Sequence, residues 1–327
     1  MLKPRIAITM GDPAGVGPEI ILKAIQPELF ATCVPIVIGD VKMLQRAAQW
    51  VHVQLPIVPI KTLADIGSEQ AIYCYDMPCV PDDLPVGTVQ KEAGHAAYLF
   101  LEKAIQLAQA KEIAAICTAP LNKEALHLAG HHYPGHTEIL AHLTGVEDYA
   151  MLLSSPTLNV IHVTTHIGLI DAIQQITVER VAKVIKLAHD AMKKAGIAQP
   201  RIGVCAINPH AGENGLFGYG EEEEKINPAV RQMQQLGLHV EGALPADTLF
   251  YRATRGDFDI VVAMYHDQGH GPIKVLGIDA GVNITVGLPI IRTSVDHGTA
   301  FDIAGTGKAE EKSLLEAIRQ AVQFSQA

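Results

Sequence analysis

The sequence is poor in aromatic residues, cysteine and net basic charge. Aromatic residues make up 5% of the chain, and the formal net charge of −10 argues against nucleic acid as the main partner. The five cysteines include no C-x-x-C pair and no zinc spacing, which predicts reduced thiols in a cytoplasmic protein. No apolar run is long enough to cross a membrane, and the strand-like segment Ile6–Met10 is too short for a signal-peptide core.

What the sequence does contain is enough apolar material for a large core. Of 327 residues, 48% are hydrophobic and 18% charged, so the length favours two lobes or one large α/β unit. Short apolar strands alternate with amphipathic helical segments, such as residues 88–110 and 178–195, and this alternation predicts an α/β protein. No repeat or low-complexity linker separates the lobes.

A glycine-rich segment, GDPAGVGPE at residues 11–19, lies between a strand and a helical pattern. Strand, glycine-rich turn and helix is the layout of an anion-binding loop, because the first N–H groups of a helix point at the ligand. The segment is neither G-x-G-x-x-G nor a P-loop. A tight turn with proline near the helix start explains it equally well, so both interpretations remain open.

Three apolar strands are each followed by a histidine: residues 160–163 by His166, 202–207 by His210, and 260–264 by His266. A single histidine in such a place is usually structural. Three of them predict a metal site, because imidazole is the commonest nitrogen ligand of transition metals. Asp247 and Asp267 could supply oxygen ligands or orient the rings.

Most of the remaining chemistry lies in residues 259–305, which cross a strand end more than once. There Lys274, Asn283 and Arg292 could hold an anion. His136 precedes a helix that Thr137 can cap, which suits a phosphate. Residues 211–218 read as a flexible lid, and the acidic run 221–224 as the solvated first turn of a helix.

Taken together, several motifs resemble the 4-hydroxythreonine-4-phosphate dehydrogenase family over nearly the whole length. They are MGDPAGVGPE, CTAPLNKEAL, YPGHTEILA, THIGLIDA, NPHAGENGLFGYGEEE, LPADTLF, MYHDQGHGPIK and NITVGLPIIRTSVDHGTAFDIAG. The HGTAFDIAG piece also resembles the loop with which isocitrate and isopropylmalate dehydrogenases wrap the adenosine of NAD(P). The resemblance implies their two-domain α/β/α fold with the active site in the interdomain cleft. We expect residues 1–130 plus 275–327 to form the first domain and 131–274 the second.

The same resemblance implies a set of site residues. The metal ligands would be His166, His210 and His266, holding Zn, Mg, Co, Mn or Ni at the interface of a homodimer, with one histidine from the partner subunit. Substrate contacts would be His136, Thr137, Lys274, Asn283 and Arg292. The cofactor, NAD or NADP, would lie against His297, Gly298, Thr299, Ala300 and Asp302.

The implied reaction is a metal-dependent, NAD(P)-linked oxidative decarboxylation of a phosphorylated 3-hydroxy acid. Asp247, Asp267 and Lys274 are the candidates for moving the hydroxyl proton. The first expectation is conversion of 4-hydroxy-L-threonine 4-phosphate to 3-amino-2-oxopropyl phosphate, a step toward pyridoxal phosphate. The alternative is a branch that converts D-threonate or D-erythronate 4-phosphate to dihydroxyacetone phosphate and CO2, to which the segment LNKEAL at 121–126 leans slightly. A phosphate acyltransferase or a non-catalytic metabolite sensor is a hypothesis of another class, but neither needs three metal-ligating histidines together with an adenosine loop.

Overall fold

The computed structural model describes residues 3–276 and 282–325, and the chain divides into two compact units. Of the described residues, unit 1 comprises 3–147 and 288–325, and unit 2 comprises 148–276 and 282–287. The expected boundaries, at 130/131 and 274/275, assign helix α5 (His136–Thr144) to the second domain. The structure places α5 in unit 1, where it packs on helix α3 (Lys91–Gln109).

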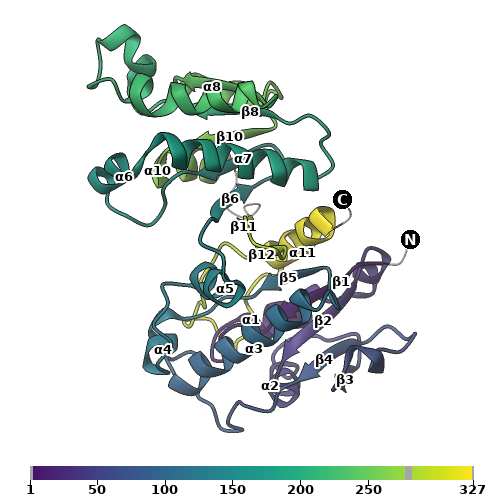
Figure 1. Cartoon of the computed structure of the whole chain (residues 1–327). Coiled ribbons are helices and arrows are strands. Elements are labelled where there is room, and N and C mark those ends of the chain that lie inside the picture. The colour runs from purple at the N-terminus through teal and green to yellow at the C-terminus, as the bar shows by residue number, and fades with distance from the viewer. Residues whose placement is uncertain (1–2, 277–281, 326–327) are drawn as a thin grey trace. The chain divides into compact units, whose positions relative to one another are not determined.

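Unit 1 is built on a parallel sheet in the order β3-β4-β2-β1-β5-β12 (Figure 1). Its strands are β1 (Arg5–Thr9), β2 (Val34–Gly39), β3 (Ile57–Ile60), β4 (Ile72–Asp76), β5 (Ala115–Thr118) and β12 (Arg292–Ser294). The central strands are buried along nearly their whole length, which is typical of a parallel sheet covered on both faces.

Helices cover both faces of this sheet. They are α1 (Gly17–Ala24), α2 (Val41–Ala47), α3, α4 (Lys123–Leu128), α5 and α11 (Lys312–Ser325), with short 3-10 turns η1 (Pro27–Ala31) and η2 (Leu63–Asp65). The connections β1–α1–β2 and β4–α3–β5 run in opposite directions along the sheet, so right-handed crossovers place α1 and α3 on opposite faces. Helix α11 packs on β5 and β12 and contacts α1. The predicted helix at 88–110 is confirmed as α3, and Gly94 lets it approach the backbone of α4, where a Cβ would lie 2.2 Å from the carbonyl of Ala125.

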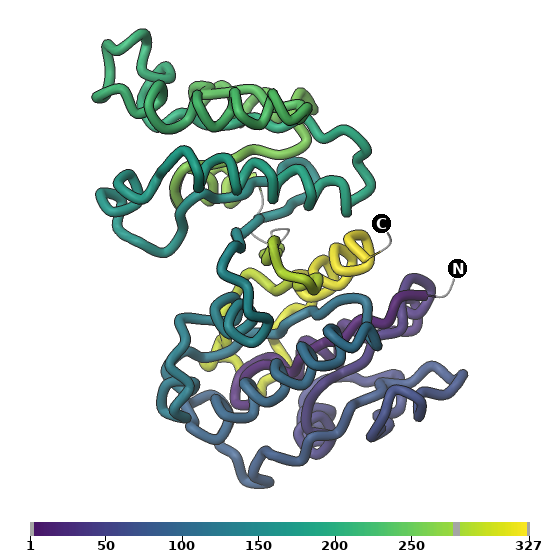
Figure 2. The backbone as a smooth tube through the Cα atoms, viewed as in Figure 1, coloured from purple at the N-terminus to yellow at the C-terminus, as the bar shows by residue number. Residues whose placement is uncertain are grey.

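Unit 2 has a mixed sheet in the order β11-β6-β7-β10-β8-β9. Figure 2 shows the path of the backbone through this unit, mostly in teal and green. Its strands are β6 (Ala150–Ser154), β7 (Asn159–His162), β8 (Arg201–Cys205), β9 (His239–Leu244), β10 (Ile260–Ala263) and β11 (Val282–Val286). Strand β6 is antiparallel to both β11 and β7, whereas β7, β10, β8 and β9 run parallel to one another. The alternation predicted from the sequence is thus confirmed as an α/β fold.

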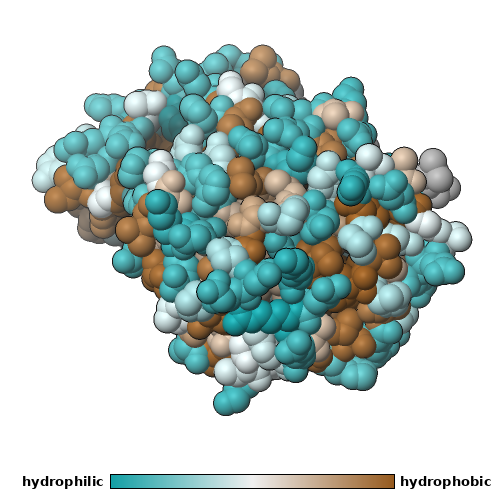
Figure 3. Space-filling view, turned by 90° about the horizontal axis from the view of Figure 1, so that it is seen from below, coloured by the Kyte–Doolittle hydropathy of each residue, from teal (hydrophilic) through white to brown (hydrophobic). Residues whose placement is uncertain are grey.

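The helices of unit 2 also lie on two faces. They are α6 (Leu169–Gln175), α7 (Val178–Lys194), α8 (Asn227–Gln235), α9 (Ala246–Thr254) and α10 (His266–Leu276), with the turns η3 (Pro209–Gly215) and η4 (Glu222–Ile226). Helix α7 packs on β7, β8 and β10 and against α8, while α9 and α10 contact β10. In the described ranges, none of the helices has the length and apolar character that a membrane span requires. Hydrophobic areas alternate with hydrophilic ones on the face seen in Figure 3.

Candidate active-site residues in the two units

Unit 2 gathers histidines at one edge of its sheet. Strands β7, β10 and β8 are parallel neighbours, so their carboxyl ends lie at the same edge, where ligands bind in α/β sheets. His166 follows β7, and His266 begins α10 directly after β10. Their ring centroids are 5.6 Å apart at an angle of 47°. Two of the three predicted metal ligands therefore lie side by side.

Two further imidazoles extend this group. The rings of His266 and His270 stack with centroids 3.6 Å apart, and the ring of His162 lies 4.7 Å from that of His270. Burial, and then the neighbouring His270, lower the pKa of His162 to about 3; burial, and then His266, lower the pKa of His270 to about 4. Sequence reasoning did not select His162. The signal that could have found it is its position at the end of β7, directly after the apolar residues Val160 and Ile161.

His210 lies in a different environment. It belongs to η3, its Nδ1 is 2.9 Å from Oε2 of Glu213, and its ring meets the edge of Phe217 at 5.9 Å. Its side chain is 66% exposed. Over residues 3–276 and 282–325, no three His, Cys, Asp or Glu side chains are grouped so as to hold an ion. The described chain therefore pairs His166 with His266 and leaves His210 outside that pair.

The loop that carries His210 is held by a buried acid. Glu222 is 4% exposed, and its carboxylate accepts hydrogen bonds from the N–H groups of Ile207 (3.0 Å) and Asn208 (2.7 Å) and from Nδ2 of Asn208 (3.1 Å). The prediction that 221–224 is the solvated first turn of a helix is wrong at Glu222, whose carboxylate is buried and takes the place of water as the partner of these donors. Several residues of this loop have positive φ angles, such as 52° at His210, and this backbone strain has to be offset by contacts such as those of Glu222.

The candidates for proton transfer differ in their surroundings. Asp267 is 91% exposed and its Oδ1 lies 2.7 Å from Nδ1 of His266, a contact that orients the ring. Asp247 is exposed in the first turn of α9 and accepts from the N–H of Thr248. Lys274 is half-buried in α10, and burial lowers the pKa of its ammonium group.

A pocket of about 450 Å³ opens beside the histidine pair. His166, His266 and Asp267 contribute polar groups to its lining, and Leu169 of α6 contributes an apolar side chain. Asn283 lies on β11, with Nδ2 3.0 Å from Sδ of Met151. Its buried Oδ1 accepts no hydrogen bond from any residue that the structure describes.

Unit 1 contains the other predicted substrate contacts. Arg292, at the start of β12, is 2% exposed and donates from Nη2 to Oγ1 of Thr118 over 2.8 Å. Burial lowers the pKa of Arg292 to about 10, so its guanidinium stays cationic at neutral pH. His136 is the first residue of α5 and Thr137 the second. Burial, and then the charge of Arg292, hold the pKa of His136 well below 6.5, so this ring offers a neutral hydrogen bond.

The predicted cofactor residues form a turn in unit 1. His297, Gly298 and Asp302 are exposed, whereas Thr299 is 8% exposed and Ala300 has a φ of 44°. The carbonyl of Thr299 accepts the N–H of Val16, the residue before α1. The glycine-rich segment 11–19 is buried throughout, so the geometry favours its interpretation as a tight turn over that of an anion-binding loop.

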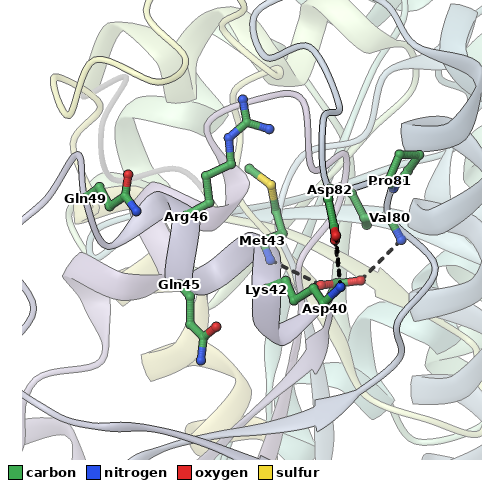
Figure 4. Close-up of a pocket in the computed structure, with 9 residues that line it drawn as sticks. All are labelled: Asp40, Lys42, Met43, Gln45, Arg46, Gln49, Val80, Pro81 and Asp82. Carbon is green, nitrogen blue, oxygen red and sulfur yellow. Dashed lines mark hydrogen bonds and ion pairs between the residues drawn. The ribbon is translucent and has the colours of Figure 1, made fainter.

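A separate pocket of about 350 Å³ lies along α2 (Figure 4). The carboxylate of Asp40 accepts the N–H groups of Met43 and Val80, and Lys42 pairs with Asp82 at 2.8 Å. Arg46 donates to the carbonyl of Leu84. No residue predicted from the sequence as a site residue lines this pocket.

Comparison with known proteins supplies the wider context. Residues 31–321 match the family described as "Pyridoxal phosphate biosynthetic protein PdxA". The chain is 58% identical to the D-threonate 4-phosphate dehydrogenase of Cupriavidus necator, over 98% of this chain and 97% of that one. It is 49% identical to the D-threonate 4-phosphate dehydrogenase of Salmonella typhimurium, over 98% of both. A crystal structure of a 4-hydroxythreonine-4-phosphate dehydrogenase from Burkholderia phymatum is 60% identical, with a TM-score of 0.90 over 99% of both chains.

Proposed function

Because the chain belongs to the PdxA family of NAD(P)-dependent decarboxylating dehydrogenases, we propose that it oxidises D-threonate 4-phosphate. The carbon that bears the hydroxyl beta to the carboxylate loses a hydride to NAD(P)⁺, and its hydroxyl group loses a proton to the protein. The resulting β-keto acid releases CO2, and the adjacent carbon takes up a proton to leave dihydroxyacetone phosphate. The observation that supports D-threonate 4-phosphate as the substrate is the 58% identity to the Cupriavidus necator enzyme along nearly the whole chain. The sequence alone put 4-hydroxy-L-threonine 4-phosphate first, and the named relatives favour its alternative.

The second candidate is 4-hydroxy-L-threonine 4-phosphate itself, which the name of the Burkholderia phymatum structure favours. The two substrates share the phosphate, the carboxylate and the reacting hydroxyl. They differ at the carbon next to the carboxylate, which bears a hydroxyl group in one and an amino group in the other. Membership of this dehydrogenase family argues against the two other hypotheses, a metabolite sensor and an acyltransferase.

Anion recognition is proposed for Arg292 and His136. A desolvated guanidinium forms strong charge-assisted hydrogen bonds to phosphate or carboxylate, and Arg292 is already held in place by Thr118. His136, neutral beside it, can donate one N–H without repelling the guanidinium. Thr137 adds a hydroxyl in the same helical turn. Lys274 and Asn283 are proposed as further substrate contacts from unit 2.

We also propose that a divalent ion is held by His166, His210 and His266, drawn from two copies of the chain. The 5.6 Å separation of the His166 and His266 rings and their imidazole chemistry fit Zn, Co or Ni better than Mg. Over the described residues the three histidines do not form one group, and in this proposal one of them comes from the second copy. Leu169 and Ile170, 54% and 75% exposed beside the pocket, offer apolar surface to such a partner. When bound, the ion supplies Lewis-acid stabilisation of the substrate oxygens.

Lys274 is the proposed proton acceptor. Burial lowers its pKa, which raises the neutral fraction able to take a proton from the substrate hydroxyl. Asp267 is assigned a different task, because its carboxylate is engaged with the His266 ring and holds the ring's orientation. Asp247 is exposed at a helix start and stays a third candidate.

The test measures nicotinamide reduction with NAD⁺ or NADP⁺ and zinc, cobalt or nickel. D-threonate 4-phosphate, D-erythronate 4-phosphate and 4-hydroxy-L-threonine 4-phosphate are compared by kcat/KM. The expected result is the highest kcat/KM for D-threonate 4-phosphate with formation of dihydroxyacetone phosphate. A higher value for the amino substrate would replace the proposal with the second candidate, and no reduction with any ester would refute both.

A further inference from the structure

We propose that Glu19 and Lys23 are positioning residues that hold the cofactor loop, residues 297–307, in the shape that receives the nicotinamide cofactor. The proposal rests on the dehydrogenase function proposed above. In this proposal the GDPAGVGPE segment binds the backbone of the cofactor loop and not an anion, a role that its sequence did not suggest.

The clamp consists of two side chains one helical turn apart on α1. Glu19 is fully buried, and its two carboxylate oxygens accept the N–H groups of Gly305 and of Gly307, the latter over 2.8 Å. Lys23 donates from Nζ to the carbonyls of Gly307 and Ala309, each over 2.6 Å. Residues four apart lie on one face of a helix. Glu19 and Lys23 can therefore bind the N–H groups and the carbonyl groups of the same backbone stretch, residues 305–309.

The opposite end of the loop is held by the same segment. The N–H of Val16 donates to the carbonyl of Thr299 over 3.0 Å. Gly15 lies so close to Thr299 that a Cβ at Gly15 would be 2.9 Å from both its Cβ and its carbonyl oxygen. Residues 15–23 therefore fasten both ends of the cofactor loop, which presents the exposed residues His297, Gly298 and Asp302, and Thr306 at the clamped end.

The backbone at the clamped end has a shape that few residues can adopt. Gly305 and Gly307 have φ angles of 80° and 71°, and a Cβ at Gly307 would lie 2.2 Å from the carbonyl oxygen of Trp50. Turns of this kind direct successive N–H groups at one point and form a small anion-binding concavity. Glu19 fills it with a buried carboxylate, whose bonds to backbone N–H groups are stronger than neutral ones.

The first experiment compares Glu19→Gln with the matched control Glu28→Gln, the same chemical change at an exposed glutamate of η1. The amide keeps the size of Glu19 but presents one oxygen instead of two. We expect its KM and its dissociation constant for NAD(P)⁺ to rise about tenfold, equivalent to about 1.4 kcal/mol. The KM for the phosphate ester and kcat at saturating cofactor should stay within about twofold, because Arg292 and His136 are untouched. Lys23→Met should shift cofactor binding in the same direction, and Glu28→Gln should shift nothing.

Hydrogen exchange gives a readout that does not depend on activity. The amides of Gly305 and Gly307 should exchange faster in Glu19→Gln than in the wild type, and the control should leave them unchanged. Unchanged exchange and cofactor affinity in the variant would overturn the clamp, as would an equal loss in every kinetic parameter. If the wild type binds NAD(P)⁺ but turns over none of the esters, the substrate proposal fails, and the clamp is still judged by the cofactor dissociation constants. A wild type that binds neither NAD⁺ nor NADP⁺ would overturn both.

Discussion

Asp12 should make the stability of the protein fall as the pH rises through neutrality. Its side chain is fully buried; Oδ1 accepts the N–H of Ala14 over 2.9 Å, and Oδ2 has no hydrogen-bond partner among the described residues. Burial raises the pKa of this carboxyl from 3.8 to about 7, against a smaller lowering by the Ala14 bond. Because the pKa is higher in the folded state, the folded protein is favoured while the group stays protonated, and that advantage is lost as the pH rises from about 4 through 7.

The size of this pH effect follows from the linkage between protonation of Asp12 and folding. Between pH 5 and pH 8 the wild type should lose about 2 to 3 kcal/mol of unfolding free energy through Asp12 alone. The substitution Asp12→Asn keeps the shape of the protonated acid and cannot ionise, so the variant should lack this loss. Urea unfolding of both proteins at pH 5, 6, 7 and 8 measures it. Parallel pH profiles for wild type and variant would refute the argument, since Asp12 would then have no raised pKa in the folded state.

Three further substitutions test the site. Arg292→Met should raise the KM for the phosphate ester roughly 100-fold, because a charge-assisted hydrogen bond to an anion is lost; an unchanged KM would remove Arg292 from substrate binding. Wild-type kcat should rise with pH through the lowered pKa of Lys274, and Lys274→Met should abolish that rise together with most of the turnover; a variant that keeps turnover and pH profile would exclude Lys274 as the proton acceptor. Glu222→Gln should lower the unfolding free energy by about 1 to 3 kcal/mol, since the N–H groups of Ile207 and Asn208 lose a charged acceptor. The exposed control Glu224→Gln should leave it unchanged, and equal effects of the two would contradict the buried role.

Much of the fold could be predicted because its signals are local. The period of apolar residues in Lys91–Gln109 and the apolar run Ile260–Ala263 mark helix α3 and strand β10 without knowledge of any partner. His166 and His266 each follow a strand of the parallel pair β7 and β10, so their rings lie at one edge of the sheet, while the metal site predicted for them with His210 stays a prediction. The substrate assignment was less accessible, because the two candidate esters differ at one carbon.

Other features depended on contacts that have no local signature. Burial of Glu222 follows from the turn of the chain at 207–222, whereas Glu223 and Glu224 in the same acidic run are exposed. The placement of α5 in unit 1 depends on its packing against α3. His162 joins the histidine group only because α10 carries His270 back over β7.

The sequence by itself determined the alternation of strands and helices, the family and the residue types available for chemistry, because periodicity and motif spacing are properties of neighbouring residues. Only the tertiary structure decided which of those residues meet. Glu19 and Gly307 are 288 positions apart, and no local pattern in either segment indicates a carboxylate bound to that backbone. Such pairs form because a buried polar group without a partner costs free energy, and the partner often comes from a distant part of the chain.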